Sequence, residues 1–157
     1  MDIIPSYDIE NIYLYKYNKE TIKIILSNLK KYTKFKKICF NNCGLTKLPS
    51  LPDTLSELYC SYSNLTELPN LSNLFNSLTH LFCSNNNLTK LHNLPNSLIN
   101  LDCHYNKLTE LPDLPNSLTY LNCHNNKLTE LPYLPNSLTH LYCYGNHLIY
   151  PTVECQI

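Results

Sequence analysis

The feature that most constrains the fold is a pattern that recurs every 20 residues between Phe35 and Leu148, with three extra residues near Asn73–Phe75 in the second copy. Its consensus is L-x-x-L-x-C-x-x-N-x-L-T-x-L-P-x-L-P-N-S. Six copies agree in phase, and they begin at Phe35, Leu55, Leu78, Leu98, Leu118 and Leu138. A short repeat of fixed length is typical of a solenoid, in which each coil packs only against its neighbours. We therefore predict a solenoid over residues 35–150.

Each repeat divides into a strand-like half and a proline-rich half. Counted from the first apolar residue, positions 3 to 7 alternate, so positions 4 and 6 face inward and positions 3, 5 and 7 face outward. Stacked copies of this half predict a curved parallel sheet on the concave side. The L-P-x-L-P half lacks amide donors and favours extended backbone, so it cannot be helical. We expect a polyproline-like return with turns on the convex side.

Position 9 is asparagine in four repeats, at Asn86, Asn106, Asn126 and Asn146. A side-chain amide there can bond the backbone of the turn that leaves the strand. Stacked copies predict an asparagine ladder, in which each hydrogen bond contributes about 1 kcal/mol net.

A solenoid exposes its core at both ends and needs caps. Residues 1–34 are expected to form the first cap, with a helix over about residues 18–34. Asn18 suits an N-cap, and an apolar stripe follows at helical spacing: Ile22, Ile25, Leu26 and Leu29. Residues 12–15 fit either a strand or a helix. Residues 151–157 alternate like a short edge strand or partial cap, and that uncovered edge predicts weak self-association.

Composition bounds the setting of the chain. Its 157 residues suit one domain, and 12 basic residues balance 12 acidic ones. No segment approaches the roughly 18 apolar residues of a membrane span, and the first residues lack a signal-peptide pattern. We expect a cytoplasmic protein that has reduced thiols and no membrane partner. Basic residues gather at Lys30–Lys37, which we interpret as a solvated surface of the cap rather than a nucleic-acid site.

Five of the eight cysteines lie at inward position 6: Cys60, Cys83, Cys103, Cys123 and Cys143. We interpret them as a column of small apolar side chains in a reduced core. Adjacent parallel strands allow the Cα separation of a disulfide but point both thiols the same way. The spacings lack paired zinc ligands, and we predict no metal.

Catalytic signals are weak. Asp102 and His104 alternate with Cys103, which places imidazole and thiol on opposite faces, whereas a nucleophile and its base must be within hydrogen-bond reach. Gly44 and Gly145 are too few for a phosphate-binding loop. The sequence predicts neither an enzyme nor a cofactor.

The repeat pattern resembles that of leucine-rich repeat proteins over roughly three quarters of the chain. The short L-P-x-L-P form is similar to secreted bacterial effectors in which repeats accompany a ubiquitin-ligase domain. It also resembles repeat proteins of giant DNA viruses, which share the Asn-, Lys- and Tyr-rich composition. The resemblance implies a protein-binding role on the concave face. We expect no ligase domain in this chain. The viral resemblance implies a partner in the host cytoplasm.

Specificity is expected where the repeats differ, at the outward positions. These positions carry many aromatic and histidine side chains, and tyrosine is common at binding hot spots. We predict that a partner protein contacts Tyr59, His80, Phe82, His104, Tyr120, His124, His140, Tyr142 and Tyr144. The structural alternative is that cross-strand ring pairs only stabilise the sheet. His104 and His124 lie on adjacent strands and could titrate together near pH 6.5.

Two functions follow from these patterns. The leading hypothesis is a non-enzymatic module that binds a protein on its concave face. The alternative is a substrate-recognition adaptor, which the N-terminal helix would tether to a larger complex such as a ubiquitin ligase.

Overall fold

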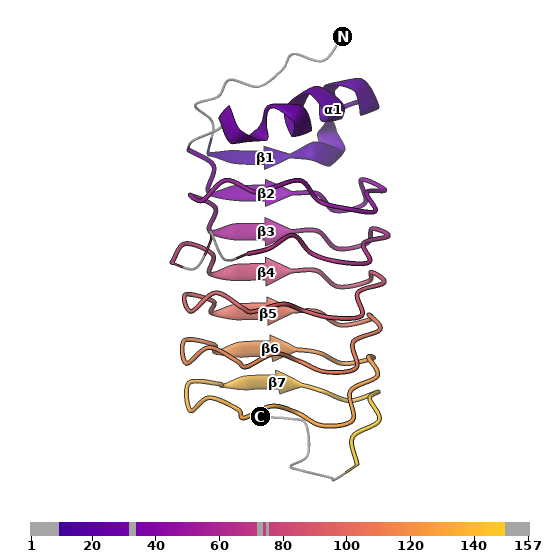
Figure 1. Cartoon of the computed structure of the whole chain (residues 1–157), viewed down its shortest axis with the longest axis vertical. Helices are drawn as coiled ribbons and strands as arrows, with labels where there is room; N and C mark the ends of the chain where they lie inside the picture. Colours follow the sequence, from indigo (N-terminus) through magenta and orange to yellow (C-terminus); the bar gives the residue numbers. More distant parts are fainter. Residues whose placement is uncertain (1–9, 32–33, 72–73, 75, 150–157) are drawn as a thin grey trace.

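Short parallel strands, one per coil, form the backbone of the structure. The computed structural model describes residues 10–31, 34–71, 74 and 76–149. In this part of the chain a seven-stranded parallel sheet runs in sequence order. Its strands are β1 (Asn11–Tyr13), β2 (Lys37–Cys39), β3 (Glu57–Tyr59), β4 (His80–Phe82), β5 (Asn100–Asp102), β6 (Tyr120–Asn122) and β7 (His140–Tyr142). Figure 1 shows them as rungs of one ladder, all pointing the same way. The predicted leucine-rich repeat solenoid is confirmed.

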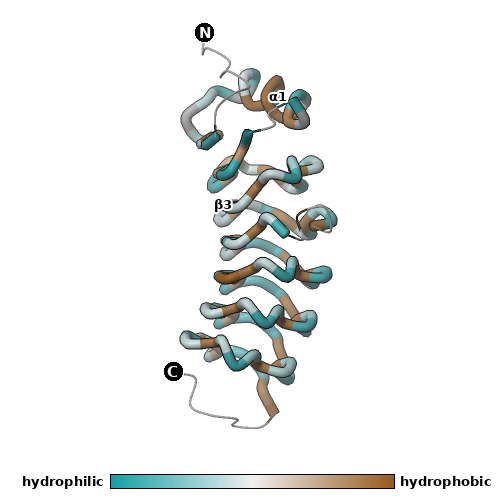
Figure 2. The backbone as a smooth tube through the Cα atoms, turned by 90° about the vertical axis from the view of Figure 1, so that its left-hand side faces the viewer, coloured by the Kyte–Doolittle hydropathy of each residue, from teal (hydrophilic) through white to brown (hydrophobic). Residues whose placement is uncertain are grey.

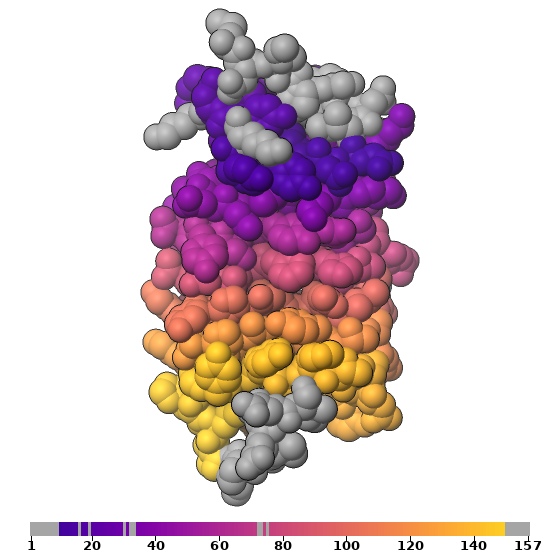
Figure 3. Space-filling model, turned by 180° about the vertical axis from the view of Figure 1, so that it is seen from behind, coloured from indigo at the N-terminus to yellow at the C-terminus, as the bar shows by residue number. Residues whose placement is uncertain are grey.

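The register places equivalent repeat positions side by side. The central strand residue is buried in every repeat, as Leu81, Leu101 and Leu121 illustrate. Its two neighbours on each strand face outward, which matches the predicted alternation. Figure 2 shows the coils edge-on as stacked rungs, and Figure 3 shows them as successive bands along the long axis. Each coil therefore buries its leucines chiefly against the coils before and after it.

The asparagine ladder is present and continuous through the last four repeats. The Asn106 amide donates to the carbonyls of Cys83 and Cys103, both at 3.0 Å, and its oxygen accepts from the Leu88 N–H at 3.0 Å. Asn126 repeats the arrangement one coil later and shares the Cys103 carbonyl at 3.1 Å. Each position-6 carbonyl inside the ladder thus accepts from two successive asparagines. Ser63 holds this position in the second repeat, and its buried hydroxyl has no hydrogen-bond partner among the described residues.

A left-handed residue follows the strand in all six repeats. Position 8 is occupied by Asn42, Tyr62, Asn85, Tyr105, Asn125 and Gly145, with φ between 49° and 68°. This turn lets the chain leave the sheet and bring position 9 inward. Asparagine and glycine adopt the left-handed region readily, whereas a tyrosine there is unusual. A Cβ on Gly145 would collide with the Asn125 side chain, so a larger residue here would require Asn125 to move.

The N-terminal cap differs from the sequence expectation. Residues 12–15, which fitted either a strand or a helix, contain parts of two elements. Residues 12 and 13 belong to β1, which pairs with β2, and a 3-10 turn follows at Leu14–Lys16. Helix α1 spans only Lys19–Ser27, and a 3-10 turn covers Leu29–Lys31 (Figure 1). The prediction of a helix over 18–34 was therefore too long. Asn28 ends it, because its side-chain amide donates to the Ile24 carbonyl at 2.9 Å.

The start of α1 agrees with the prediction. The Asn18 side chain accepts from the Thr21 N–H at 2.9 Å, and Ile25 and Leu29 are buried against the first coil. The predicted strand over 153–157 lies outside the described residues, so the self-association of that edge stays a prediction. No helix among the described residues is long and apolar enough to cross a bilayer.

The cysteine column is buried as predicted, with one correction. Cys60, Cys83, Cys103 and Cys123 are fully buried free thiols. Burial raises the pKa of Cys123 to about 12, so this thiol stays protonated at neutral pH. Cys143, however, is disulfide-bonded, so the expectation of a fully reduced column is wrong at its last member. Cys39 was placed on the outward face, yet it is only 6% exposed, between Tyr13 and Tyr59 in the sheet register.

The ladder makes a testable prediction about stability. Asn106→Ala should lower the free energy of unfolding by about 2–4 kcal/mol, because it removes three buried hydrogen bonds and leaves the Leu88 N–H unpaired. Chemical denaturation followed by circular dichroism measures the change. Asn116→Ala, at an exposed return position, is the matched control and should change stability by less than about 0.5 kcal/mol. Equal stability of the two variants would contradict the role given to the ladder.

Candidate functional site: the aromatic sheet face

The nine predicted contact residues lie on the outward positions of the sheet, but they form three separate ring groups. The register pairs His80 with Asn100 and Phe82 with Asp102, so polar side chains interrupt the rings at β5. One group lies over β3 and β4, one over β6 and β7, and one at the position just beyond β5, β6 and β7. The sequence located the rings, whereas their grouping depends on which side chains stand next to each other.

The first ring group is Tyr59, Phe82 and His80. The Tyr59 and Phe82 rings stack with centroids 4.6 Å apart and planes 16° from parallel, and His80 lies 6.3 Å from Phe82. The Lys37 ammonium is 4.4 Å from the Tyr59 centroid and 3.0 Å from a Glu57 carboxylate oxygen. Lysine, carboxylate and ring therefore hold one another at the N-terminal end of the face.

Three ionisable groups in this cluster have shifted pKa values. The hydrogen bond to Glu57 raises the pKa of Lys37 above its usual value. Burial opposes the ionisation of Glu57, but the hydrogen bonds from Lys37 and Tyr59 outweigh it and lower the pKa of the carboxyl. Burial and the hydrogen bond to Glu57 raise the pKa of the Tyr59 hydroxyl. At neutral pH the cluster thus carries a lysine–glutamate pair that neutralises itself beside an uncharged tyrosine.

The second ring group is Tyr120, His140 and Tyr142. Tyr120 lies 6.1 Å from His140 and 5.8 Å from Tyr142, and both pairs are tilted rather than parallel. Burial, followed by the charge of Asp102, raises the pKa of Tyr120, which keeps its hydroxyl protonated. This group is uncharged when His140 is neutral.

The third ring group, the ring stack, consists of His104, His124 and Tyr144. Their centroids are spaced 4.5 Å apart in both pairs, and the planes are within 15° of parallel. Strands of a sheet repeat at about 4.8 Å, so rings at one position of successive coils meet face to face. Tyr105 packs edge-on against His104 and His124 at 5.6 and 5.3 Å.

Polar contacts hold the ring stack in place. The His104 Nδ1 contacts the Asp102 carboxylate, and the His124 Nδ1 lies 2.5 Å from the Asn122 oxygen. Burial, then the nearby His104, lowers the pKa of His124, and the charge of Asp102 only partly opposes this. His124 is therefore neutral at physiological pH. The Cys103 thiol is buried in the core, and burial raises its pKa well above the usual value.

Sequence reasoning missed two residues of this surface. Tyr62 and Tyr105 lie outside the nine predicted contact residues, yet their side chains are 65% and 54% exposed and their backbones have positive φ angles. A signal was present, because the same position is Asn or Gly in the other four repeats. A bulky residue at a position that otherwise uses Asn or Gly points to a constraint other than folding.

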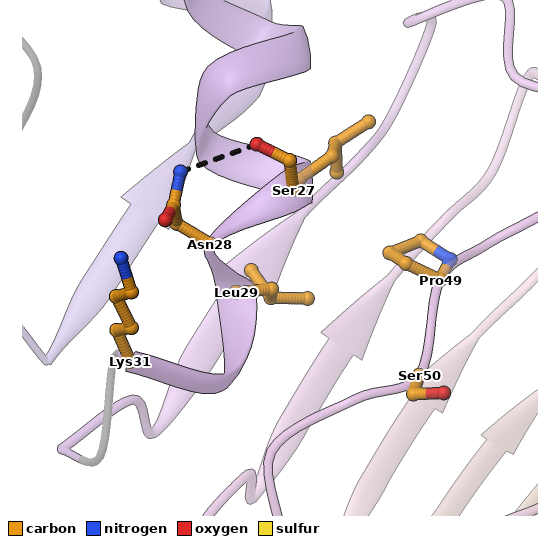
Figure 4. A pocket seen from close by; sticks show the side chains of 7 residues that line it. Ser27, Asn28, Leu29, Lys31, Pro49 and Ser50 are labelled. Atoms are coloured by element: carbon orange, nitrogen blue, oxygen red, sulfur yellow. Dashed lines mark hydrogen bonds between the residues drawn. The ribbon is translucent and has the colours of Figure 1, made fainter.

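Two further findings concern the rest of the described chain. A pocket of about 310 Å³ lies between the end of α1 and the first return, lined by Leu26, Asn28, Lys31 and Pro49 among others. Figure 4 shows Leu29 pointing toward Pro49 across it, from the 3-10 turn. Among the described residues, no group of three or more His, Cys, Asp or Glu side chains is placed to hold a metal ion.

Known proteins share this fold and repeat. The Leucine Rich Repeat family profile matches residues 117–136. YopM from Yersinia enterocolitica WA-314 matches with a TM-score of 0.73 and 41% identity, over 76% of this chain and 26% of that one. YopM from Yersinia pestis, described as a leucine-rich effector protein, matches with a TM-score of 0.72 and 41% identity, over 76% and 33%.

A third structure, a Shigella effector LRR domain, matches with a TM-score of 0.68 and 34% identity, over 75% of this chain and 52% of that one. The chain therefore spans about a quarter to a half of these proteins. Curated protein sequences gave no significant match. The predicted similarity to bacterial effector repeats is confirmed, and the similarity to giant-virus proteins stays a prediction.

The lowered pKa of His124 predicts a pH-dependent stability. An unfolded histidine has a pKa of about 6.5 and so binds a proton more readily than folded His124. Its contribution to stability is complete above that pH and is lost as the pH falls through the unfolded value. Between pH 7 and 5.5, the free energy of unfolding should fall less in His124→Asn than in wild type, as measured by urea denaturation. His147→Asn, an exposed histidine outside the sheet, is the control, and a wild-type slope in His124→Asn would refute the assignment.

Proposed function

We propose that this chain is a non-enzymatic protein-interaction module that binds a partner protein on its aromatic sheet face. The observation that carries the proposal is the ring content of that face. Side chains of Tyr, Phe and His cluster at outward positions where a solubilising surface would carry charge. Concave faces of repeat proteins are extended binding surfaces. The similarity to effector repeats supports the same class of function.

The charge pattern favours recognition by rings rather than by ionic contacts. The Lys37–Glu57 pair and the Asp102–His104 contact use the charged groups of the face internally. Association should therefore depend only weakly on salt. Two large rings, Tyr59 on β3 and Tyr142 on β7, lie four strands apart and would anchor a partner that spans several strands. We propose a host protein as the partner and the host cytoplasm as the compartment.

A triple substitution tests the face as a whole. Tyr59→Ser, Tyr120→Ser and Tyr142→Ser together should weaken partner binding about a hundredfold or more, because anchor truncations cost about 1–2 kcal/mol each. A quantitative pull-down from eukaryotic lysate, with wild type as reference, identifies the partner and measures its retention. Tyr133→Ser removes an 80% exposed tyrosine away from the sheet and serves as the control. Equal retention by the triple variant, with matching circular dichroism, would place function elsewhere.

A second function, the adaptor, is favoured by the cap. Ile24 on α1 is 42% exposed, and the pocket beside Asn28 and Pro49 opens on the same element. An adaptor would use this surface to join a larger complex, such as a ubiquitin ligase, while the sheet holds the client. Ile24→Ser should then release the complex and keep the client, whereas a module without a second partner would lose nothing.

A further inference from the structure

The exposed tyrosines of the strand ends are spaced at every second coil. Tyr62, Tyr105 and Tyr144 belong to the second, fourth and sixth repeats and are 65%, 54% and 55% exposed. We call them the tyrosine row. Tyr144 stands one position before the left-handed residue of its repeat, whereas Tyr62 and Tyr105 occupy that residue. The row follows the long axis of the solenoid and crosses the direction of the strands.

Backbone hydrogen bonds hold the row in register. The Tyr62 N–H donates to the Ser84 carbonyl at 3.1 Å, and the Asn85 N–H donates to the His104 carbonyl at 3.0 Å. In the same way, the Tyr105 N–H donates to the His124 carbonyl at 3.1 Å. The parallel ladder therefore extends beyond the strands, and neighbouring coils keep strand spacing at this position. Tyr62 and Tyr105 occupy the same position two coils apart, so their backbones are separated by two strand spacings, about 9–10 Å. Tyr144 lies one residue earlier in its coil, and its ring and that of Tyr105 both contact His124.

That separation matches one turn of a polyproline II helix. Such a helix has three residues per turn and rises about 3.1 Å per residue, so equivalent side chains recur every 9.3 Å or so. Proline-rich segments bind to surfaces lined by aromatic rings, because the helix is preformed and loses little entropy. A proline-rich peptide lying along the row would place one proline face against each successive tyrosine.

Hydrogen bonding and charge point to the same ligand. A polyproline II helix makes no internal hydrogen bonds, so its carbonyls need donors, and tyrosine offers a ring together with a hydroxyl. The Asp102 carboxylate next to the row already contacts His104. An uncharged, proline-rich segment therefore suits this edge better than a charged one.

Backbone conformation is the independent observation. Tyr62 and Tyr105 adopt φ of 53° and 49°, where Asn42, Asn85 and Asn125 occupy the same position. A bulky side chain in this region is strained, whereas asparagine tolerates it. The backbone conformation alone would favour asparagine at both of these positions. The two tyrosines thus have a cost in stability that a ligand contact explains.

We propose that the tyrosine row binds a proline-rich peptide in the polyproline II conformation, running along the solenoid axis beside the sheet. The inference rests on the proposed protein-interaction function and names the chemical class of the partner segment. Six or seven residues would span from Tyr62 to Tyr144, at a rise of about 3.1 Å each.

The test uses the whole chain and a fluorescently labelled peptide of nine prolines, with anisotropy as the readout. Wild type should bind it saturably. A Tyr62→Asn/Tyr105→Asn variant should bind at least tenfold more weakly and unfold at the same or a higher temperature, since Asn suits both backbone positions. Tyr133→Asn, which removes an even more exposed ring away from the row, should bind like wild type. A Gly-Ser peptide of equal length should not bind.

Three outcomes would overturn the inference. They are no saturable binding of nonaproline at millimolar peptide, equal binding by the double variant, and binding of single-stranded oligothymidine in preference to nonaproline, which would indicate ring stacking with bases. The pull-down with Tyr59, Tyr120 and Tyr142 substituted separates the two proposals. If that variant loses its protein partner while nonaproline never binds, only the polyproline inference fails.

Discussion

The structure depends on a buried asparagine amide that links each coil to the one before it. Asn106 donates to a carbonyl of its own coil and to one of the preceding coil, and accepts an N–H from the preceding coil. These bonds satisfy backbone groups that the narrow interior would otherwise leave unpaired, at a cost of about 1–3 kcal/mol each. Because Asn126 shares the Cys103 carbonyl, the coils are connected in series rather than pairwise. Leucine burial supplies the driving force, and the amides fix the spacing.

The geometry of the aromatic sheet face is a consequence of this ladder. For position 9 to turn inward, position 8 must be left-handed, and it is so in every repeat. The ladder bonds then hold positions 7 and 8 of neighbouring coils at strand spacing, which brings His104, His124 and Tyr144 face to face. The interactions that hold the core together therefore also determine where the exposed rings stand. A partner of the kind proposed above would meet a preformed surface and would lose little freedom in ordering it.

The structural features that recur in every repeat could be predicted from the sequence, whereas features that occur only once could not. Strand positions, inward leucines and the asparagine bonds follow from six copies in phase. The end of α1 at Ser27 depends on one competing side chain, Asn28, and β1 carries no repeat at all. For the candidate site, the outward positions located the rings on the sheet, but their division into three groups depends on neighbours such as Asp102 that differ between coils. Cys143 is likewise an exception, because it is disulfide-bonded whereas the other four cysteines at position 6 are free thiols.

The residue types at position 8 distinguish the requirements of folding from those of ligand binding more clearly than the residue types on the strands do. On the strands, ring pairs such as Tyr59 and Phe82 both stabilise the sheet and offer a contact surface, so their presence alone does not distinguish the two roles. At position 8 the two demands oppose each other, because the backbone favours Asn or Gly while Tyr62 and Tyr105 expose more than half of their surface. Backbone preference does not account for either ring, although Tyr105 also packs edge-on against His104 and His124. The strand ends, rather than the middle of the sheet, are therefore where this solenoid departs furthest from what its own stability requires.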